Sequence, residues 1–162
     1  MSKPYMFAFF AIGFLISATA QSQTQNIDCR VVAVADGDTI TCLSSYNQQL
    51  RIRLHQIDAP EYSQDFGTRS KQHLSQMVFD KTVQVQIVGK DQYNRWLGTI
   101  YHNNQNINKL MVNDGMAWAY KKYVIDDDFI KLEKQARSAK RGLWAHPNPI
   151  YPATFRYNHR RR

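Results

Sequence analysis

The order of strand-like segments restricts this chain to few folds. Two strand patterns flank a turn within residues 29–43, a third covers 50–54, and a segment of helical period follows at 65–80. Two more alternating stretches, at 81–90 and 94–102, precede the remaining helical patterns. Five strands with one helix inserted after the third are typical of a five-stranded Greek-key OB barrel. We therefore expect an α+β fold: an OB barrel with about three α-helices.

The first 20 residues differ in kind from the rest of the 162-residue chain. Lys3 is their only charged residue, a long apolar run follows, and Ala18-Thr19-Ala20 ends the segment. This pattern is typical of a secretory signal peptide cleaved after Ala20, with an uncleaved membrane anchor as the alternative. We expect export to the periplasm or the medium, without stable membrane association after cleavage.

The remaining chain is expected to form one domain. A polar lead over 21–27 precedes the domain at 28–146, and a basic tail with three prolines, expected to be extended or loose, covers 147–162. Removing residues 1–20 takes away one lysine, which leaves 20 Lys and Arg against 13 Asp and Glu, a formal charge of +7. This charge either attracts a polyanion such as nucleic acid, anionic lipid or acidic glycan, or only confers solubility.

The chain has two cysteines, Cys29 and Cys42, one on each arm of the hairpin around Asp36-Gly37-Asp38. In an oxidising compartment we expect them to form a disulfide. Neither their number nor their spacing suits a zinc site or a thiol nucleophile.

The third strand pattern slips register at its end. The apolar side of 50–54 resumes at Ile57, an odd position, so a bulge or bend at 55–56 has to absorb one residue. After the slip, Asp58 lies on the polar face together with Arg53. A bulge of this kind often lies beside an active site, but it also occurs at barrel corners without a functional role.

A second acid, Glu61, follows Asp58 within reach of the same site. Three extended residues span about 10 Å at most, so one carboxylate can hold a metal ion while the other orients a water molecule. Asp36 and Asp38 offer further oxygen ligands, and a hard cation such as Ca²⁺ or Mg²⁺ suits this set. The alternative is that all four acids serve turns and helix caps.

Arg95 begins the last strand pattern directly after a turn. Alone it is most simply a solvated charge, but with Arg53 it offers two guanidinium groups suited to the oxygens of a phosphoryl transition state. A metal ion, a water-orienting acid and two arginines together suffice for phosphodiester hydrolysis.

Three blocks carry a resemblance to a known family. The stretches "VVAVADGDTITC", "LRIRLHQIDAPE" and "DQYNRWLGTIYH" resemble, in the same order, the signature blocks of the staphylococcal nuclease family. The resemblance extends over about residues 28–144. It implies a Ca²⁺-dependent nuclease, expected to be monomeric, that hydrolyses DNA and RNA and leaves 3′-phosphorylated products.

The resemblance also implies roles for individual residues. Asp38 and Asp58 correspond to carboxylate ligands of Ca²⁺, and Ala59 to a residue that offers its backbone carbonyl. The implied catalytic residues are Arg53, Glu61 and Arg95. The implied nucleotide-contacting residues are Tyr93 and Tyr120.

Two other functions fit parts of the pattern. A non-catalytic OB module that binds nucleic acid would need the barrel and the basic surface but not the acids. A protein that binds envelope polyanions would use the surface charge alone, with incidental nuclease activity. Because all five charged positions of the resemblance are present, the sequence favours the enzyme.

Overall fold

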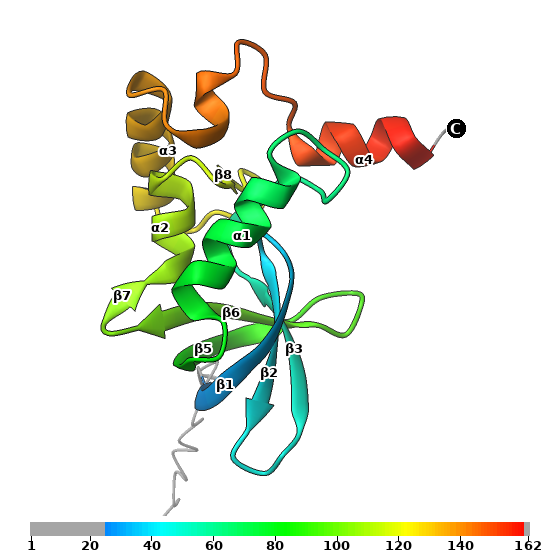
Figure 1. The fold of residues 1–162 in the computed structure, drawn as a ribbon, viewed down its shortest axis with the longest axis vertical. Coiled ribbons are helices and arrows are strands. Elements are labelled where there is room, and N and C mark those ends of the chain that lie inside the picture. Colours follow the sequence, from blue (N-terminus) through cyan, green and yellow to red (C-terminus); the bar gives the residue numbers. More distant parts are fainter. Residues whose placement is uncertain (1–24, 161–162) are drawn as a thin grey trace, which may run out of the picture.

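The computed structural model describes residues 25–160 and has a closed β-barrel at one end (Figure 1). Its barrel strands are β1 (Gln25–Asp36), β2 (Thr39–Ser44), β3 (Gln49–Leu54), β5 (Thr82–Lys90) and β6 (Trp96–His102). Hydrogen bonds join them in the order β3–β2–β1–β5–β6, and a parallel pairing of β3 with β6 closes the ring. This arrangement confirms the predicted five-stranded OB barrel.

Strand β5 shows why these segments form the barrel. Val83, Val85 and Ile87 are buried in the core, and the residues between them are more exposed. In β3 the alternation fails at one position, because Arg53 is buried as well, with 9% of its surface exposed. A charge buried in a barrel strand requires polar partners.

The predicted slip in register follows β3 directly. Gln56 has a left-handed backbone with φ 68°, and its Oε1 accepts hydrogen bonds of 2.8 Å from both backbone N–H groups of residues 125–126. Beyond it, β4 (Ile57–Asp58) leaves the barrel and pairs with β8 (Trp118–Ala119). The bend therefore brings Asp58 back beside Arg53, as the sequence pattern predicted.

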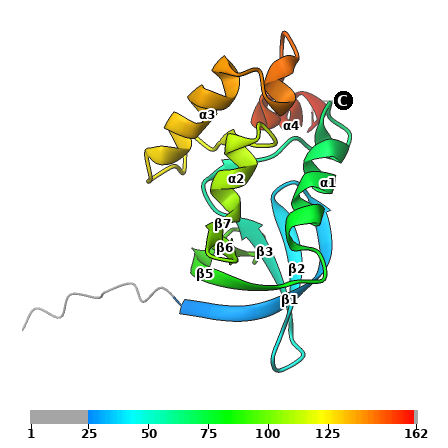
Figure 2. The ribbon, with the colours of Figure 1, turned by 60° about the vertical axis from the view of Figure 1, so that its left-hand side comes forward.

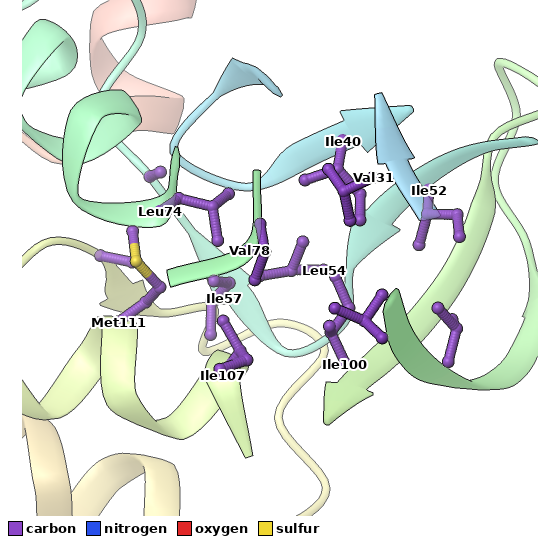
Figure 3. Packing of buried hydrophobic residues seen from close by; sticks show 14 of the residues in the cluster. Val31, Ile40, Ile52, Leu54, Ile57, Leu74, Val78, Ile100, Ile107 and Met111 are labelled. Atoms are coloured by element: carbon purple, nitrogen blue, oxygen red, sulfur yellow. The ribbon is translucent and has the colours of Figure 1, made fainter. Parts of the chain in front are cut away.

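The helices gather at one end of the barrel (Figures 1 and 2). Leu74 and Val78 meet Met111 and the barrel residue Leu54 in one apolar cluster (Figure 3). This close-packed core fixes the barrel against the helices. The remaining elements are α1 (Gly67–Val78), β7 (Gln105–Asn106), α2 (Ile107–Asn113), α3 (Asp128–Ser138), the 3₁₀ turn η1 (Gly142–Ala145) and α4 (Pro152–Arg160).

Backbone contacts set the starts of α1 and β1. The N-cap of α1 is Phe66, in a left-handed conformation (φ 68°) and without a side-chain hydrogen bond. A backbone hydrogen bond from Gly67 to the Gln64 carbonyl joins the loop to the helix instead. Strand β1 begins inside the expected polar lead, because residues 25–27 pair with β5.

Residues 152–160 of the C-terminal tail form helix α4, whereas the tail was expected to be extended or loose. Its last proline, Pro152, is the first residue of α4, where its missing N–H costs no hydrogen bond and its fixed φ favours the helix. The preceding Tyr151 packs its ring edge-on against Trp118, with centroids 5.1 Å apart. The proline-containing tail therefore contains a helix start as well as a connecting segment.

The structure confirms the predicted disulfide between Cys29 in β1 and Cys42 in β2, whose Cα atoms lie 5.5 Å apart. Across residues 25–160, no helix has both the length and the apolar character needed to cross a membrane. The expected signal peptide (1–20) lies outside the described residues.

Candidate active site

Two buried aspartates and one arginine form the centre of the site. Asp38 comes from the β1–β2 turn and is 6% exposed, while Asp58 comes from β4 and is fully buried. Nη2 of Arg53 donates to Oδ2 of Asp38 at 3.0 Å and to Oδ1 of Asp58 at 2.9 Å. One guanidinium nitrogen therefore holds carboxylates from segments 20 positions apart.

Arg53 is held on its other side by the backbone. Its Nη1 donates to the carbonyl oxygens of Leu54 and Ile57, at 3.3 and 3.0 Å, and its guanidinium lies 5.4 Å from the ring centre of Tyr120. Burial acts to lower the pKa of Arg53, but Asp38 and Asp58 outweigh it and raise the pKa. The side chain is therefore a fixed, permanent cation.

The β1–β2 turn is fitted closely against β4 and α1. The backbone N–H of Ala59 donates to Oδ2 of Asp38 at 3.0 Å. A Cβ atom on Gly37 would overlap the Ser70 hydroxyl and the Ala59 side chain, so only glycine allows this approach. The turn thus places Asp38 beside Ala59, whose carbonyl was predicted to bind the metal ion.

Asp36 lies beside the same turn and is only partly buried. Its Oδ1 accepts a 3.0 Å hydrogen bond from the backbone N–H of Asp38. Burial, followed by the charge of Asp38, raises the pKa of Asp36 to about 6. Burial and Asp38 therefore make this carboxylate of the pocket costly to ionise.

Glu61 joins the site through a residue that the sequence did not single out, Arg156 of α4. Nη1 of Arg156 donates to Oε1 of Glu61 at 2.6 Å and to Oδ1 of Asp58 at 3.1 Å, and its Nη2 donates to Oδ2 of Asp58 at 2.9 Å. Burial raises the pKa of Asp58, although both arginines act in the opposite direction. Asp58 and Glu61 thus share one guanidinium.

Arg95 lies at the rim of the pocket rather than in the carboxylate cluster. Its Nε donates to Oδ2 of Asp91 at 2.8 Å, and its Nη1 reaches Oγ1 of Thr39 at 3.5 Å. Asp91 is partly desolvated, but hydrogen bonds from Arg95 lower its pKa. Thr39 donates in turn to Asp38 at 3.0 Å, which links Arg95 to the centre through one hydroxyl.

The two predicted tyrosines lie on different walls of the pocket. Tyr93 is 60% exposed, and hydrogen bonds with Gln92 and Arg160 lower its pKa. Tyr120 is half-buried beside Arg53 and packs edge-on against Tyr123, with centroids 4.7 Å apart. Both rings line the cavity, as base-contacting residues would.

The site opens into one cavity of about 950 Å³, which neither the fully buried Asp58 nor Ala59 lines. Every predicted catalytic residue lines it, as do both predicted tyrosines and Asp38. From α4, the cavity receives Ala153, Arg156, Tyr157 and Arg160, so the helix forms one of its walls.

The oxygen donors fit a hard cation better than any other guest. Within residues 25–160, no three His, Cys, Asp or Glu side chains are grouped as a metal site. However, Asp38 and Asp58 both face one cationic nitrogen, and Asp58 and Glu61 face a second cation, Arg156. Two carboxylates and a nearby backbone carbonyl are ligands that Ca²⁺ accepts.

An OB barrel whose cavity combines buried carboxylates with fixed arginines belongs to the class of phosphodiester-cleaving enzymes. The family model for "Staphylococcal nuclease homologue" matches residues 51–146. The chain therefore belongs to the staphylococcal nuclease family, which supports a nuclease, a hydrolase, as its class of activity.

Bacterial relatives agree with this assignment. A Haemophilus influenzae protein named "Uncharacterized endonuclease" is 48% identical over 128 residues, which cover 79% of this chain and 72% of the relative. A Shigella flexneri protein named "Micrococcal nuclease" is 42% identical over 137 residues, 78% of each chain. An Escherichia coli O157:H7 protein, also named "Uncharacterized endonuclease", is 42% identical over 133 residues, 82% of this chain and 86% of the relative.

Sequence reasoning missed Arg156 because it reaches Asp58 from 98 positions away. The one signal that could have found α4 is Pro152 followed by Ala153, a pattern typical of a helix start. That helix places arginines at 156 and 160 on one face, and both line the cavity.

Proposed function

We propose that this protein is an exported, Ca²⁺-dependent endonuclease that hydrolyses DNA and RNA and gives 3′-phosphorylated products. The observation that carries this proposal is the fixed Arg53 on two buried carboxylates, at the wall of a cavity that also holds Glu61 and Arg95. Export rests on the signal-like pattern of residues 1–20. The protein is proposed to act as a monomer.

Asp38, Asp58 and the Ala59 carbonyl would hold the metal ion. When bound there, Ca²⁺ supplies positive charge that polarises the scissile phosphate. Both aspartates are already directed at cationic nitrogens, so their oxygens are arranged for a positive guest. Their burial strengthens any charge interaction in the pocket.

Glu61 would orient the attacking water and accept its proton. Its side chain is about one third exposed and lines the cavity, so water can reach it. Its distinct role is supported by its separation from Asp38, which bonds Arg53 and Ala59 instead. Attack in line with the 5′ oxygen would leave the phosphate on the 3′ side.

The two arginines would divide the phosphate oxygens between them. Arg53 is fixed from four directions and would bind a non-bridging oxygen in both the ground and transition states. Arg95 is held at the rim by Asp91 and would stabilise the charge that develops in the transition state. Tyr93 and Tyr120 would contact the nucleotides on either side.

Digestion of plasmid and single-stranded DNA, with Ca²⁺ or with a chelator, tests the proposal. We expect hydrolysis only with Ca²⁺, and 3′-phosphate ends on the products by end-group analysis. RNA digested under the same conditions tests the wider substrate range.

Matched variants locate the activity. Glu61→Gln should lose at least about 100-fold in rate, in the range of general acid–base contributions. Asp80→Asn removes an exposed carboxylate that pairs with Arg30 outside the cavity, and should retain the wild-type rate. Intact DNA in the presence of Ca²⁺ and folded wild-type protein would instead favour a non-catalytic OB binding module.

A further inference from the structure

Helix α4 places a cation where the proposed metal ion would bind. Arg156 uses both terminal nitrogens, at 2.9 and 3.1 Å from the two carboxylate oxygens of Asp58 and 2.6 Å from Glu61. This is the fork geometry in which a guanidinium binds carboxylates most strongly. Hydrogen bonds and charge raise the pKa of Arg156 despite its partial burial, so it stays charged at any physiological pH.

The contact places cations on both oxygens of Asp58. Oδ1 already accepts from both Arg53 and Arg156, and Oδ2 accepts from Arg156. A Ca²⁺ ligand must approach the ion to about 2.3–2.6 Å. Ca²⁺ would be a third cation on a carboxylate that already binds Arg53 and Arg156. Like charges at such short range repel strongly in a partly buried pocket, so the ion and Arg156 compete for Asp58.

Fewer packing contacts fix α4 to the protein than fix the barrel strands to one another. The helix has nine residues, too few to be stable alone, and Pro152 is its one buried residue. Its docking depends on Tyr151 against Trp118, on the hydrogen bond from Gln64 to the Ile150 carbonyl, and on Arg156 itself. Arg160, at the far end, lines the same cavity as Tyr93, and Gln92 and Arg160 both lower the pKa of that tyrosine.

We propose that α4 is an autoinhibitory latch: Arg156 substitutes for the divalent cation on Asp58 and Glu61, and docking of α4 excludes Ca²⁺. The metal affinity of the protein is then set by this competition, because only molecules with an undocked latch bind the ion. This inference rests on the proposed function, since it takes Ca²⁺ as the competing ion.

Calcium titration by calorimetry, without nucleic acid, tests the competition on the mature full-length chain. Arg156→Gln keeps the length and helix propensity of the side chain but removes its charge, and should bind Ca²⁺ at least about tenfold more tightly than wild type. Arg30→Gln removes the same charge from an exposed arginine that pairs with Asp80 outside the cavity, and should change the affinity by about twofold or less. Equal affinities for wild type and Arg156→Gln would overturn the latch.

Hydrogen exchange gives a second readout, independent of metal affinity. In wild-type protein, saturating Ca²⁺ should speed exchange of the amides of α4 while leaving those of the barrel strands unchanged. In chelator, Glu61→Gln should also speed exchange in α4, because it removes one partner of Arg156. Unchanged α4 exchange in both experiments would overturn the latch.

The failures are distinguishable. If wild type and Arg156→Gln bind Ca²⁺ equally and α4 does not respond, the latch is wrong and the calcium-dependent nuclease stands. If neither protein binds Ca²⁺, both the proposed metal dependence and the competition are wrong.

Discussion

The two arginines on Asp58 come from regions that are held very differently. Arg53 belongs to a barrel strand, is 9% exposed and donates to two carboxylates and two backbone carbonyls. Arg156 belongs to a short terminal helix, its side chain is 30% exposed, and it bonds only carboxylates in the contacts described. The same chemical group is thus a fixed part of the site in one place and a displaceable occupant in the other.

This difference follows from how each region is stabilised. The barrel strands are stabilised by an apolar cluster that they share with α1 and α2 (Figure 3). Helix α4 lies beyond that cluster, beside the loop that precedes α1 (Figure 1). A residue on the barrel can be positioned for catalysis, whereas a residue on α4 can move at small cost.

The largest expected effect is on the rate of DNA hydrolysis, and it concerns Arg95, the arginine at the rim of the cavity. Arg95→Gln should lower kcat for DNA hydrolysis by about 10²–10³-fold, because a preorganised donor to the transition state is lost. Arg30→Gln removes an exposed arginine that pairs with Asp80, and serves as the charge-matched control. Steady-state kinetics at saturating Ca²⁺ measure both; a kcat loss below about tenfold for Arg95→Gln would contradict its proposed role.

Replacing Arg53 and replacing Arg156 should lower the free energy of unfolding by different amounts. Arg53→Gln should lower the free energy of unfolding by about 3 kcal/mol, because Asp38 and Asp58 remain buried without their shared cation. Arg156→Gln should cost about 1 kcal/mol or less, since Asp58 keeps Arg53 and the helix is partly exposed. Denaturant unfolding in chelator measures both, and equal losses would break the distinction between fixed and displaceable arginines.

The disulfide should strengthen the barrel half alone. Replacing Cys29 and Cys42 by serine should lower the free energy of unfolding by about 2–3 kcal/mol, because the 13-residue separation no longer restricts the unfolded chain. Hydrogen exchange in α4 should stay as in wild type. Peptide mapping without reduction should find the two cysteines linked in wild type, and two free thiols would contradict the bond.

Ionisation of Asp36 should make the free energy of unfolding depend on pH. Its pKa of about 6 in the folded protein exceeds the value of about 3.9 in an unfolded chain. The folded state therefore binds this proton more tightly, and stability is lost as the pH rises from about 4 through 6. In chelator, Asp36→Asn should be more stable than wild type by up to about 2 kcal/mol at pH 8 and equally stable at pH 4; an equal gain at both pH values would exclude ionisation as the cause.

The sequence predicted the barrel half well because its signals are local. Alternation in β5 and the odd position of Ile57 suffice to place the strands and the bend that brings Asp58 beside Arg53. Whether Arg95 touches the carboxylates cannot be read from spacing, since that depends on how Asp91 orients it.

Helix α4 and its contacts could not be predicted because the partners of α4 are distant in sequence. Arg156 bonds Glu61 from 95 positions away, and nothing in the local pattern of the tail indicates that pairing. The prolines before α4 are compatible with an extended segment and with a helix start, and only packing of Tyr151 on Trp118 decides between them.

A crystal structure of the mature chain with Ca²⁺ and a phosphorothioate dinucleotide tests the central claim most directly. We predict an ion within about 2.3–2.6 Å of oxygens from Asp38, Asp58 and the Ala59 carbonyl. The phosphorothioate should lie between Arg53 and Arg95, with Arg156 withdrawn from Asp58. An ion bound elsewhere, or an ion on Asp58 with Arg156 still bonded to it, would contradict the account.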